Sequence, residues 1–207
     1  MGCKKESVPK STQPSELTSA PPAKVEEEKP TPEAAEPSEA NEAVTPGGGV
    51  EEATPAEGVE VVAVFDTTKG KIVIELYPDS APETVANFKK LIGKKFYDGL
   101  TFHRYVEDFV IQGGDPVGDG TGGPGYTIKD EFNQRKHVAG TVAMAKTDAP
   151  NSAGSQFYIC LAPAPYLDGS YTVFGQVIQG MDNVFKLRQG DKMTKVILED
   201  KSKYVKE

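Results

Sequence analysis

The 207-residue sequence has no tryptophan, two histidines and two cysteines. Cys3 and Cys160 cannot form a disulfide framework, and Cys160 lies in an apolar run where a small buried hydrophobic residue is expected. His103 and His137 have no cysteine or carboxylate near them at a spacing typical of metal ligands, so no metal site is predicted. No run reaches the roughly 18 apolar residues that a membrane-spanning helix needs. The sequence therefore predicts neither a metalloprotein nor a transmembrane protein.

Aromatic residues are absent from residues 1–57, which hold 9 of the 16 prolines and carry 12 acidic against 5 basic residues. A segment this poor in apolar side chains cannot bury enough surface to offset the entropy of ordering, so we predict a disordered, acidic tail or linker rich in Pro, Glu and Ala. Residues 58–207 hold all 17 aromatics and carry 18 basic against 19 acidic residues. They are predicted to form one domain, which lacks the basic patch of a nucleic-acid-binding protein.

The N-terminal residues Gly2, Cys3, Lys4 and Lys5 precede a long polar stretch, as in a processed bacterial lipoprotein. In that interpretation Cys3 carries a lipid anchor and the protein lies in the bacterial cell envelope. The alternative is an ordinary start with an unmodified Cys3 and a cytoplasmic protein. N-myristoylation at Gly2 is disfavoured, because Glu6 occupies the position where that pattern requires Ser or Thr.

Short apolar runs alternate with loops rich in Gly, Pro, Asp and Asn throughout residues 58–207. Residues 59–65 and 72–76 predict a hairpin with one buried face, and residues 80–93 predict a helix that opens with a capping box at Ser80 and Glu83. Further strands are expected at 109–112, 140–145, 156–161, 172–177 and 195–198, and a second helix at 181–188. Many short strands with two helices favour an antiparallel barrel whose ends the helices cover.

The glycine-rich segment 118–123 has the spacing of a dinucleotide-binding loop, but Pro124 follows where a helix would have to begin. A calcium loop starting at Asp115 fails as well, since Val117 and Tyr126 occupy ligand positions. Arg104 is a fixed cation among apolar residues. Its pattern is compatible with a surface salt bridge to a neighbouring acid or with a role in a binding site.

A series of motifs in residues 60–200 occurs in the order and at the spacing typical of one enzyme family. The motifs are Phe102-His103-Arg104, Phe109, Gln112-Gly113-Gly114-Asp115, Gly120-Thr121-Gly122-Gly123, Met144-Ala145, Pro150-Asn151-Ser152, Gly154-Ser155-Gln156-Phe157-Tyr158-Ile159, Leu167-Asp168-Gly169 and Val173-Phe174-Gly175. This region resembles a cyclophilin, a peptidyl-prolyl cis-trans isomerase. The resemblance implies a mainly β fold, a closed eight-stranded antiparallel barrel capped by two α-helices.

The resemblance also implies which residues act. Arg104 is similar to the catalytic arginine of the family, with Gln112 and Phe109 beside it in the catalytic set. The substrate-binding residues implied are Val110, Gly120, Ala145, Lys146, Gln156, Tyr158, Tyr166, Leu167 and Tyr171. The expected partners are proline-containing peptides and unfolded or nascent proteins, the expected state is a monomer, and no cofactor or metal is implied.

Several of these positions depart from the pattern that many cyclophilins share. Tyr166 stands where many members carry Trp, which puts cyclosporin binding in doubt. Val110 replaces a methionine, Tyr158 a phenylalanine and Tyr171 a histidine of the pocket, and Lys146 stands where an asparagine often contacts the peptide backbone. Substrate preference is therefore expected to differ from that of cyclophilins with the common pattern. The catalytic arginine of that pattern is retained as Arg104.

Overall fold

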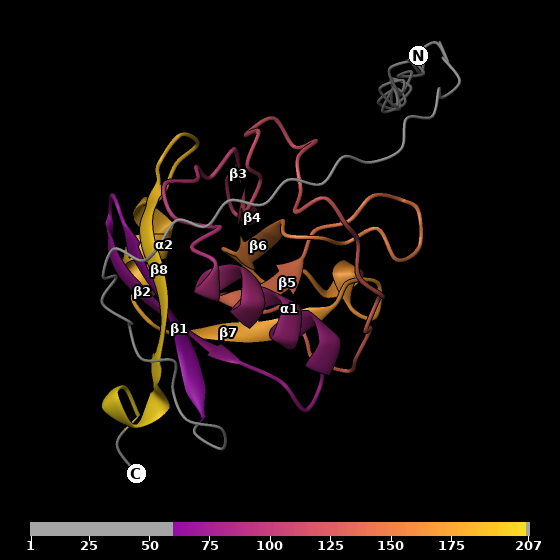
Figure 1. Cartoon of the computed structure of the whole chain (residues 1–207), viewed down its shortest axis with the longest axis horizontal. Helices are drawn as coiled ribbons and strands as arrows, with labels where there is room; N and C mark the ends of the chain where they lie inside the picture. Colours follow the sequence, from indigo (N-terminus) through magenta and orange to yellow (C-terminus); the bar gives the residue numbers. More distant parts are fainter. Residues whose placement is uncertain (1–59, 206–207) are drawn as a thin grey trace, which may run out of the picture. The chain divides into compact units, whose positions relative to one another are not determined.

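A computed structural model describes residues 60–205 (Figure 1). The predicted tail 1–57 and Cys3 lie outside the described residues. None of the helices between residues 60 and 205 is both long enough and apolar enough to cross a bilayer.

Eight antiparallel strands form one sheet in the order β3-β4-β6-β5-β7-β2-β1-β8. The strands are β1 (Val61–Thr67), β2 (Gly70–Leu76), β3 (Arg104–Val106), β4 (Val110–Gly113), β5 (Thr141–Met144), β6 (Phe157–Cys160), β7 (Val173–Gln179) and β8 (Met193–Asp200). The helices are α1 (Pro82–Gly93) and α2 (Met181–Lys186), with 3-10 turns η1 (Pro165–Leu167) and η2 (Lys201–Lys203). The predicted strands and both helices are confirmed, except that β3 was not predicted and α2 ends two residues earlier than expected.

The prediction of a closed barrel is wrong. The strands β3 and β8 are the two edges of the sheet, and no ladder joins them. The segment before β3 contacts the start of β8: the backbone N–H of Phe102 donates to the Asp191 carbonyl at 2.8 Å, and that of Met193, the first residue of β8, donates to the Leu100 carbonyl at 2.9 Å. Because no ladder pairs the short strand β3 with β8, the sheet remains an open half-barrel.

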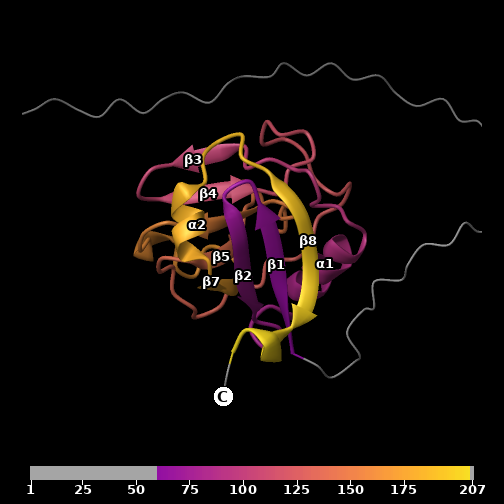
Figure 2. The same cartoon turned by 90° about the vertical axis from the view of Figure 1, so that its left-hand side faces the viewer.

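The hairpin of β1 and β2 lies beside β8 in the sheet (Figure 2). We expected one buried face, and the structure buries both. Ala63 and Phe65 point into the main core, whereas Val62, Val64 and Val73 form a second cluster on the outer face. The partly buried side chains of Ile178, Ile197 and Tyr204 pack against that cluster. Residues from β7 and β8, together with the residue that follows η2, therefore cover a strand face that its sequence pattern had left to solvent.

Aromatic rings fill the space between α1 and the sheet. The ring of Phe88, from α1, lies 4.9 Å from that of Phe174 and 5.7 Å from that of Phe157, both edge-to-face. Phe65 and Tyr97 pack into the same cluster. This close packing holds the inner faces of β6 and β7 against the helix. It therefore restrains the strand β6, whose other side chains face outward.

The capping box predicted at Ser80 is not formed. Ala81 is the N-cap residue of α1 and has no side-chain cap. The carboxylate of Glu131, 47 and 48 residues away, instead accepts hydrogen bonds from the backbone N–H groups of Thr84 at 2.7 Å and Glu83 at 3.0 Å. A negative charge at a helix N-terminus satisfies its free donors, so this contact ties the loop after the glycine-rich segment to α1.

Candidate functional site

An outward-facing row of side chains crosses four neighbouring strands. In the register of the sheet Arg104 of β3 lies opposite Gln112 of β4, and Gln112 lies opposite Tyr158 of β6. Tyr158 in turn lies opposite Ala143 of β5. Because side chains alternate along a strand, Ile111 points into the core while Val110 and Gln112 face outward. The sheet thus aligns residues that are up to 54 positions apart in the sequence.

A cavity of about 200 Å³, which we call the apolar cavity, opens over this row. It is lined by Arg104, Phe109, Val110, Gln112, Ala145, Lys146, Tyr158, Leu167 and Tyr171. Val110 and Tyr158 form its buried floor, and the partly buried Phe109, Leu167 and Tyr171 pack around them. The cavity can therefore enclose a small apolar ring, with the Arg104 guanidinium at its edge.

Nine of the twelve predicted site residues line the apolar cavity. Gly120 and Gln156 line a second cavity beside it. Tyr166 lines neither: its side chain is 70% exposed, and its ring lies 5.9 Å from that of Phe109. Tyr166 thus packs against Phe109, which lines the apolar cavity, but does not line the cavity itself.

A chain of hydrogen bonds runs from Arg104 to the glycine-rich loop. The Arg104 guanidinium donates through Nη1 to Gln112 Oε1 at 3.2 Å, and Gln112 Nε2 donates to Gln156 Oε1 at 2.9 Å. Gln156 Nε2 then donates to the carbonyl oxygens of Gly120 at 2.9 Å and Gly122 at 2.8 Å. The carboxamides of Gln112 and Gln156 each have one orientation that satisfies both hydrogen-bond neighbours. These hydrogen bonds therefore fix the position of the guanidinium relative to the cavity.

Asp115 shapes the glycine-rich loop from within. Its buried carboxylate accepts hydrogen bonds from the backbone N–H groups of Val117 and Gly120. Burial raises the pKa of Asp115, but hydrogen bonds from the amides of Val117, Gly120 and Gly118 outweigh it and lower the pKa below its ordinary value. A Cβ atom at Gly122 would collide with the Asp115 carboxylate, so glycine is needed there to keep this carboxylate in place. The loop is a hydrogen-bonded wall of the site rather than a nucleotide or calcium loop.

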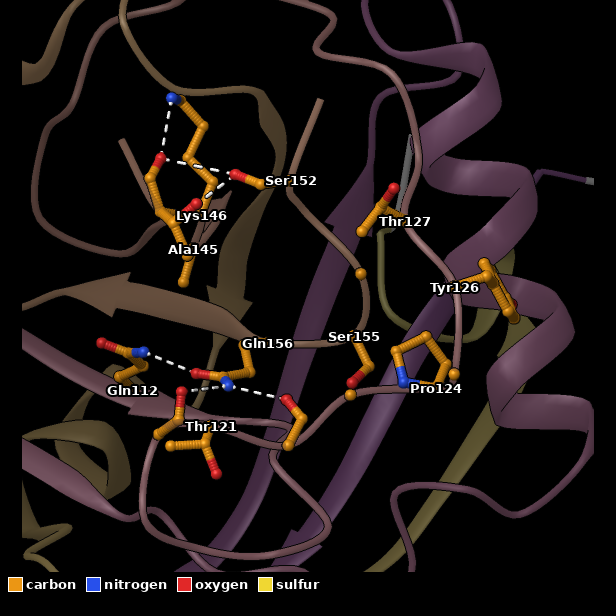
Figure 3. A pocket seen from close by; sticks show the side chains of 16 residues that line it. Gln112, Thr121, Pro124, Tyr126, Thr127, Ala145, Lys146, Ser152, Ser155 and Gln156 are labelled. Atoms are coloured by element: carbon orange, nitrogen blue, oxygen red, sulfur yellow. Dashed lines mark hydrogen bonds between the residues drawn. The ribbon is translucent and has the colours of Figure 1, made fainter. Parts of the chain in front are cut away.

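The second cavity, which we call the loop cavity, has a volume of about 460 Å³ and borders this glycine-rich wall (Figure 3). It is lined by Gln112, residues 120–127, Ala145, Lys146, Thr147, Ser152 and residues 154–156. Gln112, Ala145 and Lys146 line both cavities. The site is therefore an apolar cavity with a more polar neighbour across a shared wall.

Comparisons with known proteins agree with this arrangement. Residues 62–204 match the family described as cyclophilin type peptidyl-prolyl cis-trans isomerase/CLD. The chain belongs to the cyclophilin family. It is 49% identical over 136 residues to a peptidyl-prolyl cis-trans isomerase of Synechococcus elongatus, covering 65% of this chain and 93% of the relative. It is 52% identical over 131 residues to peptidyl-prolyl cis-trans isomerase B of Bacillus subtilis, covering 62% and 91%.

Solved structures support the same assignment. The crystal structure of a cyclophilin-type peptidyl-prolyl cis-trans isomerase of Cryptosporidium parvum is 28% identical in sequence, with a TM-score of 0.63, over 69% of this chain and 98% of the other. Cyclophilin AquaCyp293 of Hirschia baltica is 25% identical with a TM-score of 0.60, over 66% and 73%. This cyclophilin is accordingly a peptidyl-prolyl cis-trans isomerase, and its substrates are proline-containing peptides.

Below the apolar cavity this cyclophilin has a buried polar network that the sequence did not reveal. The His137 ring, fully buried, contacts the Tyr158 hydroxyl through Nε2 at 3.0 Å and Asp168 Oδ1 through Nδ1 at 2.9 Å. Burial raises the pKa of Tyr158 well above its ordinary value, so the hydroxyl stays protonated. Since Asp168 directly follows Leu167, the network ties the cavity's floor to one of its walls.

The two histidines of this cyclophilin differ in their hydrogen bonding. Both ring nitrogens of His103 are buried and have no hydrogen-bond partner among the described residues. Burial is the main cause that lowers its pKa, with a smaller contribution from Arg104, so its ring is neutral at pH 7. His137 is the histidine with satisfied partners. Its partners lie 21 and 31 residues away, and no local sequence signal connects them.

Asp168→Asn is expected to flatten the acid dependence of stability. Hydrogen bonds from the backbone and ring of His137 lower the pKa of Asp168 from 3.8 to about 2. The stabilisation from a lowered carboxyl pKa is complete above the unfolded-state value and is lost as the pH falls from about 4 to about 2. Urea unfolding of both proteins between these values measures the difference, with the exposed Asp182→Asn as control. Equal acid dependence of wild type and Asp168→Asn would contradict the assignment.

Proposed function

We propose that Arg104 is the catalytic residue of this isomerase and that the apolar cavity holds the substrate proline. The observation that carries the proposal is the position of the guanidinium. It stands at the edge of a cavity with an apolar floor and is bonded to Gln112. A ring held in that cavity would bring its own peptide nitrogen within reach of the guanidinium.

The reaction explains why such a site needs no nucleophile. An X-Pro bond is kept planar by amide resonance with a barrier of about 18–20 kcal/mol, and it isomerises in tens to hundreds of seconds without a catalyst. In the twisted state the prolyl nitrogen loses conjugation and regains a lone pair. A donor directed at this nitrogen stabilises the twisted state more than either planar state, and this difference accelerates the rotation.

Arginine suits this role better than lysine. The guanidinium stays charged and presents its donors in a planar fork, so one N–H can remain on Gln112 while others face the substrate. Phe109, Val110, Tyr158 and Leu167 would clamp the proline ring. Gln112 would hold the peptide backbone on one side of the rotating bond, and Gly120, Ala145 and Gln156 would border the residues before proline.

The direct test of activity is exchange spectroscopy on a short Ala-Pro peptide. We expect a catalytic amount of the protein to bring cis-to-trans exchange from the tens-of-seconds range into the range of seconds or faster. Exchange that stays at the uncatalysed rate in the presence of folded protein would contradict the activity.

We further propose that the protein is a monomer, that it acts on unfolded or nascent chains, and that a lipid on Cys3 places it in the bacterial cell envelope. The support for the lipid is the Gly2-Cys3 start followed by two lysines. The intact mass of protein taken from native membranes tests it. A mass without an acyl chain would favour the alternative of a cytoplasmic protein.

A further inference from the structure

The charged groups at the two cavities are of one sign. Arg104 and Lys146 are the charged residues that line the apolar cavity, and Lys146 is the charged residue that lines the loop cavity. No Asp or Glu side chain is among the lining residues of either cavity. This contrasts with residues 58–207 as a whole, which carry 18 basic and 19 acidic residues.

Lys146 has no acidic partner among the described residues. Its Nζ donates to the Thr147 carbonyl at 3.1 Å and forms no ion pair within residues 60–205. By comparison, Lys201 contacts both Glu60 at 2.6 Å and Glu75 at 2.7 Å. A lysine without a carboxylate partner at the rim of a binding site can form an ion pair with an anionic ligand.

Aromatic rings keep the Lys146 amino group near the shared wall. Its Nζ lies 5.9 Å from the ring centres of both Phe132 and Tyr171, and Tyr171 also lines the apolar cavity. In Figure 3 the Lys146 side chain lies apart from Gln112, with its amino group turned away from Gln112. That amino group donates to the Thr147 carbonyl. Only that one hydrogen bond to a backbone carbonyl must be exchanged for the amino group to meet an anion.

Asp119 and Asp148 each adjoin a residue that lines the loop cavity, but neither of them lines it. Asp119 precedes Gly120, but its carboxylate accepts hydrogen bonds from the backbone and hydroxyl of Thr121 and does not line the loop cavity. Asp148 is exposed and is also absent from the lining.

A bound peptide would present its residues before proline to this wall. A residue of extended chain spans about 3.3–3.6 Å, so a proline in the apolar cavity leaves the one or two preceding residues beside the shared residues Ala145 and Lys146. This step rests on the proposed placement of the substrate. We propose that the site selects substrates with an acidic side chain one or two positions before the proline, and that Lys146 is the residue that recognises it.

The test is a set of capped peptides with Glu or Gln at the first or second position before proline. For each pair kcat/KM is measured, and each catalysed rate is corrected for the uncatalysed rate of the same peptide. We expect the Glu peptide of at least one pair to be preferred by roughly two- to fivefold, the range of an exposed ion pair. The preference should fall toward one between about 0.01 M and about 1 M salt, as the screening length drops from about 30 Å to about 3 Å.

Substitutions of Lys146 test whether this residue causes the preference for the Glu peptide. Lys146→Gln is expected to bring the Glu-to-Gln ratio close to one, Lys146→Glu to invert it, and Lys146→Arg to retain it. Lys186→Gln, exposed on α2 and absent from the lining of both cavities, should leave the ratio unchanged.

Each outcome has one meaning. Acceleration of both peptides at equal rates would overturn the acidic preference while leaving the isomerase proposal intact, whereas acceleration of neither would contradict the isomerase activity on which the preference rests. A preference that survives in Lys146→Gln would show that this lysine is not the recognising residue.

Discussion

Arg104→Ala is expected to lower kcat/KM for X-Pro isomerisation by roughly 100-fold or more, the usual effect of removing a donor that serves the transition state. Arg104 is exposed at the edge of the apolar cavity and makes one hydrogen bond to Gln112. Its removal should therefore change the free energy of unfolding by little. Peptide exchange and thermal unfolding, measured on the same preparation, check both parts.

Arg104→Lys is the matched variant for this prediction. It keeps the positive charge but loses the planar fork, so we expect activity between that of the wild type and that of Arg104→Ala. Wild-type turnover by folded Arg104→Ala would assign catalysis to another group. Equal activity of the Lys and Arg proteins would mean that charge alone is sufficient.

Val110→Arg is expected to weaken binding of an Ala-Pro peptide by roughly tenfold or more, because the new side chain would fill a cavity of only about 200 Å³. Val110 is only 2% exposed, so the substitution can also destabilise the fold. Leu167→Asp provides an independent variant, since Leu167 is only partly buried and a carboxylate there would make the wall polar. Dissociation constants are measured by titration at a temperature where each variant is folded.

Val205→Arg is the control for both substitutions, because Val205 is 44% exposed and lines neither cavity. It should leave the dissociation constant unchanged. Wild-type affinity in folded Val110→Arg and Leu167→Asp would place the proline outside the apolar cavity.

Local patterns in the sequence predicted most of the fold. The hairpin of β1 and β2 and the helix α1 follow from alternation and from helical spacing of apolar residues, which depend only on near neighbours. The strand β3 was missed because three residues are too few to show a period. Sheet closure could not be decided from local patterns, since it depends on whether two edges distant in the sequence share a ladder.

The site was predicted only in part, and the prediction came from family resemblance rather than from local patterns. Its residues were recognised by resemblance, and the sheet register then brings Arg104, Gln112 and Tyr158 into one row. The buried network around His137 and the cap of α1 by Glu131 were missed, because each joins residues more than 20 positions apart. Such contacts are set by tertiary packing, and the residues involved have no pattern of their own.

The hydrogen bonds between Arg104 and the glycine-rich loop all point the same way. Each step donates away from the guanidinium, through Gln112 and Gln156, and ends on the carbonyls of Gly120 and Gly122. Aligned dipoles polarise one another, so each bond strengthens the next. The two glutamines therefore act as a single unit, and the free-energy costs of truncating them should not add. A change in the loop's backbone would reach the reacting bond through three hydrogen bonds, which makes the loop a place where evolution can adjust turnover without touching the arginine.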